Sequence, residues 1–304
     1  MQHPSRRRFL AALAISVLAA CTSAHSPQQT KKRMVLVPPK TGKPRAVVAL
    51  ALGGGASKGF AHIGVIKVLR ENGIPVHIVT GTSAGAVVGG LYASGMSPDR
   101  LELEAEILNK SDVADFTLST TGFIKGEKLQ NWINAKVKNR PIEQFPIKFG
   151  AVATEFDTGR TAVFSRGNAG LAVRASASIP NVFQPALING KQFVDGGLTA
   201  PVPVSAAKQL GANFVIAVDI SAKPEKMGKD SGFFAYLDQS MNVMSTAALN
   251  SELSKADIVI KPQVQQLGAV GGFDQKTEAF RLGESAARAA LPRIRAALAK
   301  YRQQ

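Results

Sequence analysis

Cysteine, histidine and acidic residues are all scarce in this chain of 304 residues, which has one cysteine, four histidines and 21 Asp and Glu. A single cysteine, Cys21, cannot form a disulfide within the chain, so stability has to come from a buried core. The histidines are not clustered and show no metal-ligand spacing, so we expect neither a metal nor a cofactor. The composition therefore argues against disulfide-scaffold and metalloprotein classes.

Basic residues outnumber acidic ones, 37 to 21, which gives a net charge of +16. A surface of this charge attracts anionic lipid head groups or other polyanions. Nucleic acid is the alternative partner, but only 6% of the residues are aromatic and no nucleic-acid-binding motif is present. We expect a membrane surface and no nucleic acid, with an ordinary solvated basic surface as the remaining alternative.

No apolar run near the N-terminus is long enough to cross a bilayer, since Phe9 to Ala20 is too short. Arg6, Arg7 and Arg8 precede that run, so residues 1–20 are interpreted as a secretory signal peptide of twin-arginine or general type. The run ends in a lipobox-like sequence before Cys21, which predicts a lipidated Cys21 followed by a flexible tether to residue 44. Thr22, and not an aspartate, follows Cys21, which by resemblance to lipoprotein sorting signals favours the outer membrane. We therefore expect a bacterial envelope lipoprotein on the periplasmic side of the outer membrane.

The strongest local motif is the pentapeptide Gly81-Thr82-Ser83-Ala84-Gly85. It follows the apolar run Val76–Val79 and precedes a small-residue segment typical of a helix. A serine on such a strand-to-helix elbow is held in a strained turn with its hydroxyl exposed. The start of the helix adds free N–H groups and positive potential beside it. Ser83 is therefore a candidate nucleophile for acyl chemistry.

A second glycine segment, Gly53-Gly54-Gly55-Ala56-Ser57-Lys58-Gly59, follows the buried-strand pattern at 46–52. A dinucleotide-binding turn fits poorly, because Lys58 occupies the last glycine position and no acidic residue follows at the required distance. A phosphate-binding P-loop fits no better. We expect Gly53, Gly54 and Gly55 to form an oxyanion hole for Ser83, with Lys58 and Ala84 supporting the substrate or the loop. The alternative is a tight turn that binds nothing.

The general base is harder to identify from the residues alone. All four histidines precede Ser83, whereas an α/β-hydrolase places its histidine last. Other chain orders exist, but we interpret His62 as a packed helix residue. Asp195, at the end of a short apolar strand and before Gly196 and Gly197, is the remaining candidate. An ordinary Asp-Gly hairpin turn is its alternative.

Together, the segments at 53–59, 81–85 and 195–197 resemble the signature blocks of patatin-like phospholipases in order and spacing. The stretch Ala177-Ser178-Ile179-Pro180 resembles a fourth block, with Asn181 departing from the small residue expected there. The resemblance covers about residues 46–210 and implies a Ser-Asp dyad without histidine. Ser83 would be the nucleophile, Asp195 the base, and the three glycines the oxyanion hole.

Alternation of strand and helix patterns predicts a three-layer α/β/α fold with a mainly parallel central sheet, formed by residues 45–304 as one domain. Strands are predicted at 46–52, 76–80, 148–154, 161–165, 192–195, 213–219 and 257–261. Helices are predicted at 58–72, 84–95, 98–110, 126–138, 170–178 and 202–210.

The C-terminal part, 275–304, is expected to form a helix pair broken at Pro292 that covers the sheet, or else a membrane-surface helix. Residues 117–128 would flank the site or form a lid.

The expected function is hydrolysis of lipid acyl esters, as a phospholipase A or lysophospholipase acting on phospholipid or lysophospholipid through an acyl-enzyme. A transacylase that uses the same acyl-enzyme is one alternative. A non-catalytic lipid-binding envelope lipoprotein is another.

Overall fold

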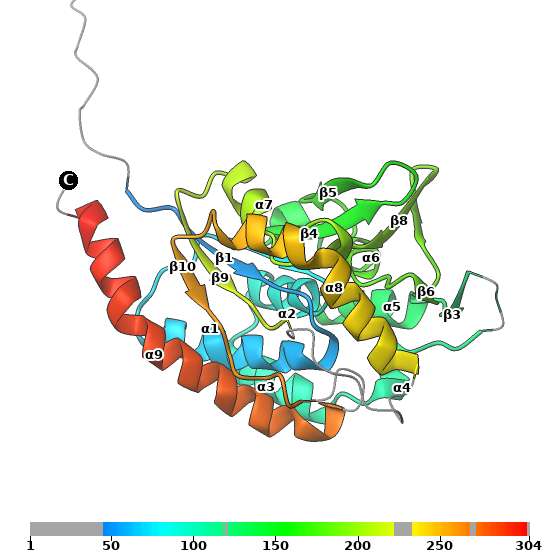
Figure 1. Ribbon diagram of the computed structural model, residues 1–304, viewed down its shortest axis with the longest axis horizontal. Helices are drawn as coiled ribbons and strands as arrows, with labels where there is room; N and C mark the ends of the chain where they lie inside the picture. The colour runs from blue at the N-terminus through cyan, green and yellow to red at the C-terminus, as the bar shows by residue number, and fades with distance from the viewer. Residues whose placement is uncertain (1–44, 118, 120, 222–232, 268–271, 303–304) are drawn as a thin grey trace, which may run out of the picture. The chain divides into compact units, whose positions relative to one another are not determined.

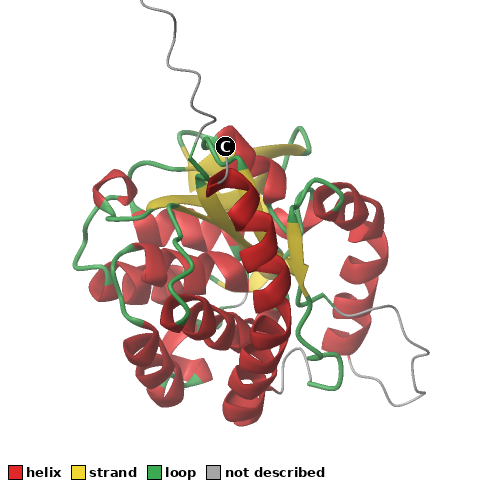
Figure 2. Ribbon diagram, turned by 90° about the vertical axis from the view of Figure 1, so that its left-hand side faces the viewer, coloured by secondary structure: helices red, strands yellow, loops and turns green. Residues whose placement is uncertain are grey.

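A computed structural model describes residues 45–117, 119, 121–221, 233–267 and 272–302 of the chain. The predicted signal peptide, Cys21 and the tether lie outside these residues and are not described. Within them, a central sheet is covered by helices on both faces, which confirms the predicted three-layer α/β/α architecture (Figures 1 and 2).

The central sheet has eight strands, in the order β10-β9-β1-β2-β4-β8-β7, with β5 paired to β4. The five strands from β10 to β4 are parallel, and β5, β8 and β7 join antiparallel at one edge. A separate two-stranded sheet pairs β3 with β6. The strand bounds are β1 Val48–Leu52, β2 Ile78–Thr82, β3 Gly122–Ile124, β4 Lys148–Glu155, β5 Arg160–Phe164, β6 Asn181–Phe183, β7 Ala186–Ile188, β8 Lys191–Asp195, β9 Phe214–Val218 and β10 Ile258–Ile260.

All seven predicted strands are present, and β3, β6 and β7 are additional. The predicted helices are also present, and α4 and α8 are additions that we did not expect from the sequence. The helix bounds are α1 Ala61–Glu71, α2 Ala84–Ala93, α3 Pro98–Ile107, α4 Lys110–Val113, α5 Glu127–Lys136, α6 Ala169–Ser176, α7 Val204–Gln209, α8 Phe233–Leu253 and α9 Lys276–Arg302. Short 3-10 turns are η1 Ala56–Phe60, η2 Ile142–Gln144, η3 Gly196–Leu198 and η4 Gly272–Gln275.

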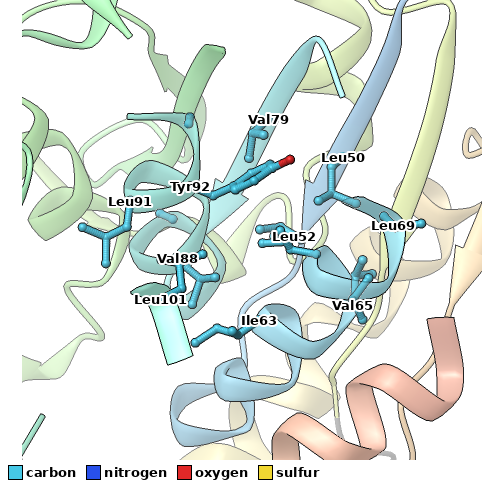
Figure 3. Close-up of a cluster of buried hydrophobic side chains, with 14 of the residues drawn as sticks. Leu50, Leu52, Ile63, Val65, Leu69, Val79, Val88, Leu91, Tyr92 and Leu101 are labelled. Carbon is cyan, nitrogen blue, oxygen red and sulfur yellow. The ribbon is translucent and has the colours of Figure 1, made fainter. Parts of the chain in front are cut away.

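Strand β1 shows how the core is divided between the two faces of the sheet. Side chains alternate along a strand, so Leu50 and Leu52 pack with α1 and α2 on one face. The small residues Ala49 and Ala51 pack against α7 on the other face. Figure 3 shows the larger cluster, in which Leu50 and Leu52 meet Val79 of β2 and side chains from α1, α2 and α3.

The C-terminal segment is one continuous helix, α9, with Pro292 inside it, so the predicted break at Pro292 is wrong. A proline in a helix interior costs about 3 kcal/mol, and burial of Phe280, Ile294 and Leu298 in the core offsets that cost. Helices α1 and α9 cross very closely, because a Cβ on Gly64 would lie 2.1 Å from the Phe280 carbonyl oxygen. The apolar face of α9 is therefore already covered by protein, which contradicts the membrane-surface alternative.

In the described part of the chain, none of the helices combines the length and apolar character that a bilayer span requires. No group of His, Cys, Asp and Glu there could hold a metal ion.

Candidate active site

Ser83 sits on a strained turn between β2 and α2, as the pentapeptide predicts. Its backbone has φ 53° and ψ −121°, a region that a non-glycine residue rarely adopts. The flanking glycines are required sterically: a Cβ on Gly81 would lie 2.3 Å from the Gly85 carbonyl oxygen, and one on Gly85 would lie 2.2 Å from that of Leu52. The close approach of α2 to β1 and β2 thus requires glycine at both positions.

Strand β4 brings Ser83 and Asp195 together. Strand β2 runs parallel along one edge of β4 and ends with Thr82 opposite Val152. Strand β8 runs antiparallel along the same edge and ends with Asp195 opposite Ala153, the next residue of β4. The other edge of β4 is occupied by β5 from Ala151 to Glu155, a stretch that overlaps the pairing of both β2 and β8. The ends of β2 and β8 therefore meet head-on, and both candidate catalytic residues lie at that junction.

Asp195 is buried, with 3% of its surface exposed. Its Oδ1 accepts a hydrogen bond from the Gly197 amide at 2.7 Å, whereas its buried Oδ2 has no partner of good hydrogen-bond geometry within the described residues. Burial raises the pKa of this carboxyl from 3.8 to about 6, against the opposing effects of the Ser83 hydroxyl and the Gly197 amide. Strand β8 continues into η3, so the alternative interpretation as an Asp-Gly hairpin turn is wrong.

The glycine loop offers fewer free amides than predicted. The Gly53 amide donates to the Val218 carbonyl and the Gly54 amide to the Pro201 carbonyl, both at 3.0 Å. These two N–H groups are therefore not available as oxyanion donors, which corrects that part of the prediction. In the described part of the chain, the amides of Gly55 and Ala84 make no hydrogen bond, and both residues line the site cavity. Tertiary pairing of the loop thus leaves the amides of Gly55 and Ala84 as candidate donors, together with that of Ala56, which also lines the cavity and makes no hydrogen bond within the described residues.

His62 is fully buried in α1, as expected for a packed helix residue. Its Nε2 lies 2.8 Å from the Gly53 carbonyl oxygen, and because a carbonyl can only accept, Nε2 carries the proton in this contact. Burial lowers the pKa of His62 from 6.5 to about 4, so the ring is neutral at neutral pH. The carbonyl of the Gly53–Gly54 peptide is thus held by His62 while its N–H is held by Pro201.

Lys58 is buried, with 2% of its surface exposed, and it does not line the cavity. A direct contact between Lys58 and a substrate is therefore excluded in this arrangement. Ala84 lies against the glycine loop, because a Cβ on Gly59 would come within 2.5 Å of the Ala84 Cβ.

Two serines near the end of α6 hold the candidate catalytic residues in place. The Ser83 amide donates to Ser176 Oγ at 3.0 Å, and that hydroxyl donates in turn to the Val152 carbonyl. The Asp195 amide donates to the Ser178 carbonyl at 2.8 Å. Sequence reasoning singled out the stretch at 177–180 but assigned it no role, and it missed Ser176. The local signal that could have identified Ser176 is its position, as a small polar residue directly before the stretch at 177–180.

A cavity of about 340 Å³ opens above Ser83 and Asp195. Most of its wall is apolar, and Asp195 and Lys110 are the charged residues among the described ones that line it. Ile124 and Phe116 belong to this wall, so the segment around 117–128 flanks the site as expected. Helix α8 contributes a wall that the sequence did not predict. The main apolar lining residues are Val87, Val88, Leu108, Val113, Leu129, Trp132, Ile179, Val182, Leu237 and Met241.

Comparison with known proteins places this arrangement in a family. The sequence pattern of the family described as patatin-like phospholipase matches residues 50–208. An uncharacterized NTE family protein of Mycobacterium tuberculosis is 36% identical over 186 residues, which cover 60% of this chain and 52% of the relative. The lysophospholipase NTE1 of Cryptococcus neoformans is 29% identical over 276 residues, covering 80% of this chain and 17% of the relative. The chain therefore spans about half, or less, of the length of these relatives.

Among solved structures, VipD from Legionella pneumophila has a similar fold, with a TM-score of 0.54 at 14% identity. The similarity covers 82% of this chain and 67% of VipD. The family match extends from β1 through α7 and so includes the glycine loop, the elbow and Asp195. The chain belongs to the patatin-like phospholipase family.

Proposed function

We propose that this protein hydrolyses acyl esters of lipids, as a phospholipase A or lysophospholipase, through a Ser83–Asp195 dyad. The observation that carries the proposal is the juxtaposition of the Ser83 hydroxyl with the buried carboxylate of Asp195 beneath an apolar cavity. An apolar cavity suits an acyl chain. The family match and the name of the Cryptococcus relative support the same class of substrate.

In the proposed mechanism, Ser83 Oγ attacks the ester carbonyl and Asp195 accepts the serine proton. A carboxylate with an ordinary pKa is a weak base, so the raised pKa of about 6 favours this role. The amides of Gly55 and Ala84 would stabilise the oxyanion, and each such donor is worth about 3 kcal/mol. Asp195 then protonates the leaving alcohol and activates a water that releases the fatty acid.

The test is release of free fatty acid from phospholipid and lysophospholipid by mature protein without Cys21. We expect Ser83→Ala and Asp195→Asn to abolish release while Ser94→Ala, which changes a buried serine hydroxyl bonded to Leu91, retains it. Activity that survives Ser83→Ala would refute the mechanism.

Two alternatives give different results in the same assay. A transacylase would transfer the acyl group to an added alcohol in preference to water. A lipid-binding module would release no fatty acid and would not react with a fluorophosphonate probe at Ser83.

We also propose that Cys21 carries a lipid anchor in a bacterial cell envelope, on the periplasmic side of the outer membrane. The lipobox-like sequence before Cys21 supports this. Metabolic labelling with a fatty acid should mark the wild-type protein and not Cys21→Ser, and only the wild type should fractionate with outer membranes.

A further inference from the structure

The lining of the site cavity is mostly apolar and includes two charged residues among those described, one acidic and one basic. Asp195 contributes the carboxylate of the proposed dyad, and Lys110 contributes a cation. Lys58, which the sequence offered as a substrate contact, lies outside the lining. Lys110 is therefore the only cationic residue among the described ones that line the cavity.

The backbone around Lys110 is held in place by neighbouring groups. Lys276 Nζ of α9 donates to the carbonyl of Leu108, itself a lining residue, and also to that of Glu106. The amide of Asn109 donates to the Asp112 carboxylate at 2.8 Å. Lys110 thus begins a short helix, α4, directly after a segment that is bonded to Lys276 of α9.

The side chain of Lys110 is available for a ligand. It is exposed, and within the described residues its ammonium makes no hydrogen bond or ion pair. Its neighbours differ: Lys128 Nζ donates to the Ser111 carbonyl and Lys276 Nζ to that of Leu108. Lys125 is also exposed but does not line the cavity.

We propose that Lys110 binds the phosphate of a glycerophospholipid whose acyl ester lies at Ser83, and so makes the site select phospholipids over neutral acylglycerols. The inference rests on the proposed function and deepens it. In a lysophospholipid only a short glycerol unit separates the ester from the phosphate. A lysine ammonium binds phosphate as a compact point charge, whereas a monoacylglycerol offers that ammonium no anion.

The test compares octanoyl lysophosphatidylcholine with monooctanoylglycerol, both below their critical micelle concentrations, so that each substrate reaches the cavity as a single molecule. Lys110→Met keeps the aliphatic stem and removes the charge. We expect it to lower kcat/KM for the phospholipid about tenfold, mainly through KM, as loss of a charge-assisted hydrogen bond does. We expect monooctanoylglycerol hydrolysis to be unchanged, Lys110→Arg to retain most of the preference, and the matched control Lys125→Met to behave as wild type.

The outcomes separate this inference from its premise. Wild-type protein that releases no fatty acid from any lipid would overturn the proposed function, and the inference with it. Wild-type activity with an equal effect of Lys110→Met on both substrates, or with none, would overturn the role of Lys110 alone. An effect confined to substrate in anionic vesicles would assign Lys110 to phosphates of the membrane surface and overturn its role in the cavity.

Discussion

The hydroxyl of Ser176 accepts a hydrogen bond from the backbone amide of Ser83 at 3.0 Å. The same hydroxyl donates to the Val152 carbonyl, so it links the strained elbow to β4. Ser176 is fully buried, and its hydroxyl bonds to two buried backbone groups, the Ser83 amide and the Val152 carbonyl. The orientation of the nucleophile therefore depends on a side chain far away in the sequence.

Ser176→Ala is expected to lower both stability and turnover, because it removes the hydroxyl that accepts from the Ser83 amide and donates to the Val152 carbonyl. The loss of stability should be about 1–3 kcal/mol, and we expect kcat to fall about tenfold because the elbow is less rigidly held. Urea unfolding and ester hydrolysis measure the two effects. Ser94→Ala should lose comparable stability and keep kcat. A Ser176→Ala variant with wild-type kcat would contradict this positioning role.

The activity should depend on the protonation of Asp195, whose pKa burial raises to about 6. The proposed base has to be ionised, so kcat/KM should rise with pH and level off above about 7. A pH–rate profile for a soluble ester, whose own ionisation does not change over this range, measures it. A profile that is flat between pH 5 and 8 would show that no group with this pKa acts in the free enzyme.

Asp195→Asn should be inactive and yet more stable than the wild type at pH 8. The pKa of Asp195 is 3.8 when unperturbed and about 6 in the folded protein, so the folded state binds more protons between these values. Stability contributed by the protonated form is present below pH 3.8 and is lost as pH rises through 6, by on the order of 3 kcal/mol. Thermal unfolding of both proteins at pH 4 and pH 8 should show the gain only at the higher pH. An equal difference at both would contradict it.

His62 should have the opposite pH dependence, because burial lowers its pKa from 6.5 to about 4. The unfolded chain binds the extra proton first, so stability is full above 6.5 and falls as pH decreases toward 4, by on the order of 3 kcal/mol. His62→Gln removes this titration and keeps a donor for the Gly53 carbonyl. Its unfolding free energy should therefore decrease less between pH 7 and pH 4.5 than that of the wild type. Parallel curves would argue against a buried neutral His62.

Gly85→Ala should prevent correct folding of the elbow, because the new Cβ would lie 2.2 Å from the Leu52 carbonyl oxygen, a backbone atom that cannot move aside. We expect the free energy of unfolding to fall by about 3 kcal/mol and little soluble protein to be obtained. Gly90→Ala in the same helix is the matched control, since its Cβ would meet side chains and no backbone atom, with the Phe149 ring at 3.2 Å and Val173 Cγ2 at 3.5 Å. Soluble yield and the unfolding midpoint compare the two. Equal behaviour would show that α2 can shift away from β1.

Local patterns in the sequence were sufficient for the elbow serine and for most of the sheet. Apolar runs between glycines indicate buried parallel strands. The strand-to-helix elbow at Ser83 can be recognised from the pentapeptide and its direct neighbours alone. Asp195 was different, because its Asp-Gly context equally fits a hairpin turn. Only the resemblance of this segment and of the other blocks to those of a known family favoured Asp195 as the general base over the hairpin turn.

Pairing between distant segments decided the rest. The register of β2 and β8 along β4 places Ser83 beside Asp195. The Gly53 amide is bonded to the carbonyl of Val218 at the end of β9, and the Gly54 amide to that of Pro201 in the loop before α7. Packing also buried Lys58, which was predicted to support the substrate or the loop, and left Lys110 in the cavity lining. It kept α9 continuous through Pro292 as well.

The sequence by itself thus determined which residues could react and which segments form strands and helices, because propensity and periodicity are local properties of the chain. The tertiary structure alone decided which amides stay free, which carboxylate oxygen lacks a partner and which lysine reaches the cavity. The physical reason is that hydrogen-bond partners and burial depend on segments that are far apart in the chain.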